Sequence, residues 1–135
     1  PEMEGMQIEF VAFGYKYGIL ADADLVFDVR CVANPYYIEA LRKKTGLDEE
    51  VRQFVMGHEE ARELFARMVS YLEYTIPLYE KEGKAQLVVG LGCTGGQHRS
   101  VTFAGLLQEH FSKSHPFVRL RMRDMEENQR EVAGR

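Results

Sequence analysis

The sequence predicts a single α/β domain of three layers, in which a mostly parallel sheet of about four strands is flanked by helices. Two observations predict this class. Short segments with an apolar run or an apolar–polar alternation recur along the chain, and longer segments with apolar residues three and four positions apart lie between them. The chain has 135 residues, of which 45% are hydrophobic, which suits one domain over 1–135 with its own core.

Four segments are expected to form the strands. Residues 7–13 and 117–122 alternate between apolar and polar side chains, which is typical of a strand with one face in the core. Residues 25–30 begin with a continuous apolar run, as in a parallel sheet that is covered on both faces. Residues 85–89 form another apolar run, which is expected to be a buried strand.

The remaining periodic segments are expected to be helices, at residues 48–56, 58–81, 101–111 and 124–131. Asp48 is a favourable N-cap for the first of them. Pro77 is expected to kink the second helix or to break it near Tyr74, because proline removes a backbone donor. Lys16, between two tyrosines and two glycines, indicates either a loop tip that faces a ligand or a surface turn.

The segment 90–100 connects the third strand to the third helix and contains four glycines. A strand–loop–helix arrangement places free N–H groups and the positive end of a helix dipole at one point, which commonly binds phosphate. Glycine lets the backbone approach the anion, although such turns also occur for tight packing alone. The expected ligand contacts here are Cys93, Thr94, Gly95, Gly96, Gln97, His98, Arg99 and Ser100.

Four further ligand contacts are expected near the end of the second strand, at Asp28, Arg30, Asn34 and Tyr36. Ligands of open α/β sheets gather beyond the carboxyl ends of the strands, and these residues leave that edge. For Asp28 and Arg30 the alternative is a structural ion pair.

Two other interpretations of the glycine segment concern its spacing. The glycines at 90, 92 and 95 match the dinucleotide pattern, but the nearest acidic residue after the next strand, Asp124, is too far along and only one strand follows. Cys93 and Arg99 have the spacing of the cysteine-dependent phosphatase signature, in which a thiolate attacks phosphorus and the arginine clamps its oxygens. That mechanism also needs an acid, for which Asp28, Asp48 and Asp124 are conceivable. Alternatively, Cys93 is a small buried residue.

The composition limits the partners. The net charge of −4 argues against a globally basic nucleic-acid binder. Arg119, Arg121 and Arg123 nevertheless form a candidate nucleic-acid patch, or else a solvated strand face. No apolar run could span a bilayer and residues 1–5 resemble no signal sequence, so we expect a cytoplasmic protein with no membrane partner, no cofactor and no metal site.

Several ordered motifs resemble the C-terminal domain of the RapZ/YvcJ family. They are CTGGQHRS at 93–100, FGYKYG at 13–18, DADLVFDVR at 22–30, NP at 34–35 and TGLD at 45–48. The resemblance extends from about Phe13 to Asp124. It implies a bacterial, cytosolic protein of a nucleotide-binding family, a fold similar to part of phosphofructokinase, and self-association as a homodimer or higher oligomer.

The resemblance also implies a function. In the RNase adapter of this family, the C-terminal domain binds small regulatory RNAs and senses glucosamine-6-phosphate, in a pocket whose residues correspond to Thr94, Gly95 and Arg99. We therefore expect a regulatory domain that binds a phosphorylated amino sugar, and that also binds a small RNA as an adapter. A cysteine-dependent phosphatase is the alternative.

Three departures limit what is carried over. These 135 residues have no counterpart of the family's P-loop domain, so nucleotide hydrolysis is not transferred. Tyr36 replaces a pocket histidine, which affects the sugar specificity. The lysine-rich tail of the RNA adapter is replaced by the acidic segment 124–130, which weakens the attraction for phosphate backbones.

Overall fold

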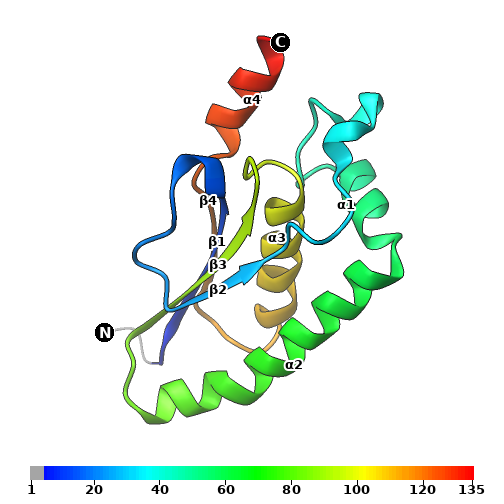
Figure 1. Ribbon diagram of the computed structural model, residues 1–135. Helices are drawn as coiled ribbons and strands as arrows, with labels where there is room; N and C mark the ends of the chain where they lie inside the picture. Colours follow the sequence, from blue (N-terminus) through cyan, green and yellow to red (C-terminus); the bar gives the residue numbers. More distant parts are fainter. Residues whose placement is uncertain (1–4) are drawn as a thin grey trace.

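The computed structural model describes residues 5–135 and shows one sheet of four parallel strands (Figure 1). The strands are β1 (Gln7–Gly14), β2 (Leu25–Asp28), β3 (Gln86–Cys93) and β4 (Val118–Met122), in the order β2-β3-β1-β4. The predicted α/β class and the parallel sheet are confirmed. Because every strand is parallel, all four carboxyl ends lie at one edge of the sheet.

The helices are α1 (Glu49–Met56), α2 (Glu59–Lys81), α3 (Arg99–Phe111) and α4 (Met125–Ala133). α1, α2 and α3 lie on one side of the sheet, and α4 lies beyond the carboxyl ends of the strands (Figure 1). Within residues 5–135, no helix is long and apolar enough to cross a membrane. Residues 1–4, on which most of the signal-sequence prediction rests, lie outside the described part of the chain.

α2 continues through Pro77 to Lys81, so of the two predicted outcomes, a kink or a break near Tyr74, the break does not occur. The carbonyl that would have accepted the missing N–H of Pro77 belongs to Glu73. Both residues are exposed, so water can satisfy that carbonyl and the helix tolerates the proline.

The core divides into two parts that follow the alternation of the strands. Alternate residues of β1, such as Ile8 and Phe10, pack against the helices together with Phe103 of α3. On the opposite face, Phe13 packs against Leu20 in a smaller cluster. The layer on that face is therefore the segment 15–24 rather than a helix.

β3 extends four residues further than the apolar run predicted, so the glycine segment begins as strand. Its last residue, Cys93, lies opposite Gly14 of β1. A Cβ on Gly92 would lie 2.7 Å from the ring of Phe13, and one on Gly90 would lie 3.1 Å from the same ring. These two glycines make room for an aromatic side chain, which is the tight-packing alternative, and the connecting loop is only residues 94–98.

Candidate functional site

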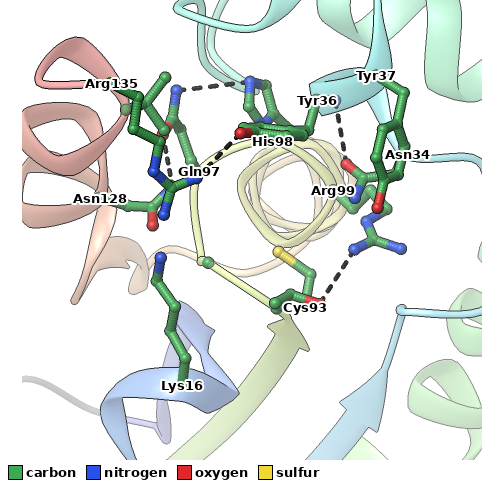
Figure 2. Close-up of a pocket in the computed structure, with 13 residues that line it drawn as sticks. Lys16, Asn34, Tyr36, Tyr37, Cys93, Gln97, His98, Arg99, Asn128 and Arg135 are labelled. Carbon is green, nitrogen blue, oxygen red and sulfur yellow. Dashed lines mark hydrogen bonds between the residues drawn. The ribbon is translucent and has the colours of Figure 1, made fainter.

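A cavity of about 340 Å³ opens at the carboxyl edge of the sheet (Figure 2). Loop 94–98, the short 3-10 helix Pro35–Tyr37 and α4 form most of its wall. Eight of the twelve residues expected to contact a ligand line it: Asn34, Tyr36, Cys93, Thr94, Gly95, Gln97, His98 and Arg99. The sequence-predicted residues thus converge from two separate segments of the chain.

The wall of this cavity is cationic. Lys16, Arg99 and Arg135 line it, and no Asp or Glu side chain does so among the described residues. The protein as a whole carries a formal charge of −4. A concave surface with one sign of charge focuses the field and attracts the opposite sign, so the cavity suits an anion.

Arg99 is the first residue of α3, and its side chain is buried, with the residue only 5% exposed. Its Nη1 donates to the carbonyl oxygens of Arg30 at 2.8 Å and Val32 at 3.1 Å, while Nη2 has only a 3.5 Å contact with the hydroxyl of Thr94. Nε has no hydrogen-bond partner, and no carboxylate in residues 5–135 pairs with the guanidinium. Asp28 is near enough for Arg99 to help lower its pKa, but Asp28 is paired with Arg30, so the buried guanidinium has no direct ion-pair partner and an anion in contact with it would be stabilised.

The thiol of Cys93 is enclosed by hydrogen bonds. Its Sγ accepts from the backbone N–H of Gly96 at 3.3 Å and of Ser100 at 3.4 Å, and the thiol donates to the Ser100 hydroxyl at 3.2 Å. Gly96 and Ser100 do not line the cavity. Two of the groups that were expected to hold the ligand therefore surround the sulfur instead.

The loop glycines permit close packing. Gly96 has a φ of 78°, which L side chains rarely adopt. A Cβ on Gly95 would lie 2.7 Å from the amide of Asn128 in α4. The loop is thus pressed between the end of β1 and α4, and Gly95 remains part of the cavity wall.

Gln97 and His98 anchor the segment 41–44 to the loop. Gln97 donates to the carbonyl oxygen of Lys44 at 2.8 Å and accepts from Asn128 at 2.6 Å. His98 Nε2 lies 3.1 Å from the carbonyl oxygens of both Leu41 and Arg42, so this nitrogen carries the proton. Burial holds the pKa of His98 below its usual value, so the ring is neutral at pH 7 and adds no charge to the cavity.

Asp28 and Arg30 do not line the cavity. They form an ion pair with each other at 2.7 Å, and the guanidinium stacks 3.9 Å above the ring of Tyr15. Their side chains have the structural role that was the alternative. Only the backbone carbonyl of Arg30 reaches the site, where it holds Arg99.

Five cavity residues were not among the predicted contacts: Lys16, Tyr37, Asn128, Val132 and Arg135. For Lys16 the sequence predicts either a ligand-facing loop tip or a surface turn, and the structure places it in the cavity wall. Asn128 and Val132 lie four residues apart on one face of α4, and Arg135 follows two residues after the helix ends. That spacing is visible in the sequence, but nothing local shows that this face covers a cavity.

The arginines of the candidate nucleic-acid patch differ in their surroundings. Arg121 pairs with Glu9 at 3.2 Å, and Arg123 donates to the carbonyl oxygen of Gly18 at 2.6 Å. Arg119 is exposed and forms no ion pair with any residue that the structure describes. RNA binding stays a prediction based on the family resemblance, as do self-association and the cytoplasmic location.

The fold and the site define an α/β domain with a cationic cavity at the carboxyl edge of a parallel sheet. A family model described as the RapZ C-terminal domain matches residues 6–126. The chain belongs to the RapZ C-terminal domain family, which confirms the resemblance seen in its motifs.

The chain is also similar to curated proteins named nucleotide-binding proteins. It is 50% identical to one from Brevibacillus brevis over 123 residues, which are 91% of this chain and 42% of the relative. A relative from Thermoanaerobacter sp. is 50% identical over 126 residues, 93% of this chain and 44% of the relative. A relative from Clostridioides difficile is 52% identical over 107 residues, which are 79% of this chain and 38% of the relative. The chain spans less than half the length of these relatives.

Proposed function

We propose that this domain is a regulatory module that binds a phosphorylated small molecule, with an amino-sugar phosphate such as glucosamine-6-phosphate as the candidate ligand. The observation that carries the proposal is the buried guanidinium of Arg99, which faces the cavity without a carboxylate partner. The family membership supports a regulatory role, and the absence of acidic residues from the described cavity wall supports an anionic ligand.

The phosphate would lie at the N-terminus of α3. His98, the residue before the helix, makes no capping hydrogen bond from its side chain. Phosphate oxygens there could accept from Arg99 and from the hydroxyl of Thr94, in the field of the helix dipole.

The sugar would extend toward the 3-10 helix Pro35–Tyr37. Asn34 Oδ1 accepts from the backbone of Tyr36, so the amide nitrogen of Asn34 is left to donate to a ring hydroxyl. Both residues line the cavity. Its volume of about 340 Å³ lies at the lower end of small-molecule sites, as a monosaccharide phosphate requires.

Calorimetric titration tests the proposal. Glucosamine-6-phosphate is expected to give saturable heat, and glucosamine alone is expected to give none. Arg135→Ala should weaken binding by roughly threefold to tenfold, because one partly exposed cation of the cavity wall is lost. Arg130→Ala is the matched control, since Arg130 lies on the same helix, pairs with Glu127 and does not line the cavity.

Inorganic phosphate and adenosine monophosphate complete the titration. Equal binding of all three anions would reduce the proposal to a general anion site. Preference for adenosine monophosphate would replace the sugar phosphate with a nucleotide, as the relatives' names suggest. No heat with any phosphate would refute the proposal.

The second candidate is a cysteine-dependent phosphatase, because Cys93 and Arg99 both line the same cavity. None of the three aspartates that could supply the acid for this chemistry lines the cavity. Asp124 accepts from the backbone N–H of Gly14 at 2.8 Å, and Asp48 accepts from that of Thr45 at 2.8 Å. Asp28 is paired with Arg30.

Cys93→Ser separates the two candidates. For a binding module, the variant should keep its affinity for glucosamine-6-phosphate within about threefold, because serine still accepts the two backbone N–H groups. Phosphate release, measured with malachite green, should stay at background for the wild type and the variant alike. Release by the wild type that the variant abolishes would favour the phosphatase.

A further inference from the structure

One carboxylate lies beside two of the three cations of the cavity. Glu131 of α4 is 3.0 Å from the Nζ of Lys16 and 3.8 Å from the Nη2 of Arg135. Its second oxygen accepts a hydrogen bond from the hydroxyl of Tyr17. Glu131 itself does not line the cavity. Two cations of the cavity thus share a single carboxylate.

The three cations therefore differ in what an entering anion must displace. Arg99 has no carboxylate partner among residues 5–135, so it is available at once. Lys16 and Arg135 both line the cavity, on the same side in Figure 2 and across from Arg99, and each is already near Glu131. A phosphate close enough to contact these two would also be repelled by the same carboxylate.

We propose that Glu131 is an internal counter-ion of the cavity, which competes with the phosphate of the ligand for Lys16 and Arg135 and so lowers the affinity. This inference rests on the proposed function. The hydrogen bonds from Tyr17 and Lys16 hold the pKa of Glu131 below its ordinary value, so the group is charged at neutral pH.

Glu131 can also yield to a ligand without unfolding its surroundings. Its side chain is 39% exposed, so the carboxylate can turn toward water when a phosphate replaces it. α4 does not depend on it alone. Asn128 still bonds to Gln97, and Arg135 still donates to the hydroxyl of Tyr36 at 2.9 Å.

Glu131→Gln tests the inference, because the amide oxygen can still accept from Lys16 and the amide nitrogen can donate to the hydroxyl of Tyr17, but the group carries no charge. The variant should bind glucosamine-6-phosphate roughly twofold to fivefold more tightly than the wild type. Glu127→Gln is the matched control, since Glu127 lies one turn earlier and pairs with Arg130 at 2.7 Å, away from the cavity. Its affinity should equal that of the wild type, and the ligand-free Tm of both variants should stay within about 2 °C of it.

Inorganic phosphate, followed by the ligand-induced rise in Tm, is the second probe. Tighter phosphate binding to Glu131→Gln with no binding of the sugar phosphate would support the counter-ion and refute only the sugar specificity. Affinities of Glu131→Gln that equal those of Glu127→Gln, or fall below them, would overturn the counter-ion and leave the proposed function standing. Failure of every variant to bind either anion would overturn both.

Discussion

Arg99→Lys is expected to weaken the binding of glucosamine-6-phosphate by roughly tenfold to a hundredfold, as the loss of a charge-assisted hydrogen bond predicts. Lysine keeps the charge but lacks the planar fork of donors. In the native cavity, Nη1 of Arg99 holds the carbonyl oxygens of Arg30 and Val32, and Nη2, which has only a 3.5 Å contact with the Thr94 hydroxyl, is left for a ligand. A single ammonium cannot serve both purposes. Isothermal titration calorimetry measures the change.

Arg30→Lys is the control for this prediction. Arg30 lies at the same edge of the sheet, but its guanidinium is exposed, pairs with Asp28 and does not line the cavity. The same chemical change there should alter the affinity by less than about twofold. The urea midpoint shows whether each variant is folded. A folded Arg99→Lys protein that binds as tightly as the wild type would show that Arg99 only supports the loop.

Gly14→Ala is expected to lower the free energy of unfolding by about 2 to 4 kcal/mol, because the added methyl group meets backbone on the opposite side. A Cβ on Gly14 would overlap the carbonyl carbon of Gly95 and lie 2.6 Å from its oxygen and 2.8 Å from the nitrogen of Gly96. Backbone atoms cannot rotate away as a side chain can. The loop must move, so ligand binding should fall as well. Urea unfolding followed by circular dichroism gives the free energy.

Gly134→Ala controls for the loss of a glycine. Gly134 follows α4 with a φ of −82°, and its nearest contact would be 3.5 Å from the added Cβ. Stability should change there by no more than about 0.5 kcal/mol. If Gly14→Ala unfolds at the same urea concentration as the wild type, that result would contradict the predicted clash between residue 14 of β1 and the backbone of loop 94–98.

The positions of the strands and helices could largely be predicted from the sequence. Periodicity is a local property of the sequence. Alternate residues of β1 pack in the cluster that contains Phe103 on one face of the sheet and in the cluster that contains Leu20 on the other. The errors arose where a local rule competes with its surroundings. Pro77 is tolerated because its side of α2 faces water. Gly90 and Gly92 belong to β3 because neighbouring strands pair with them on both sides.

The candidate site was predicted in part. Thr94, Gly95 and Arg99 are one local strand–loop–helix unit, so their joint presence in the wall follows from chain order. Chain order did not show which N–H groups of this unit face the cavity and which face the protein interior. The N–H groups of Gly96 and Ser100 point at the sulfur of Cys93, because the tight loop encloses that side chain.

The sequence by itself determined an α/β domain of the RapZ C-terminal type with an anion-suited loop between a strand and a helix, because each of these is written in neighbouring residues. Only the tertiary structure decided which charges meet. Lys16 and Arg135 come from opposite ends of the chain, and the strand order brings both to one cavity. Asp28, by contrast, neutralises Arg30 outside it. Contacts between distant segments depend on strand order and close packing, which no local pattern records.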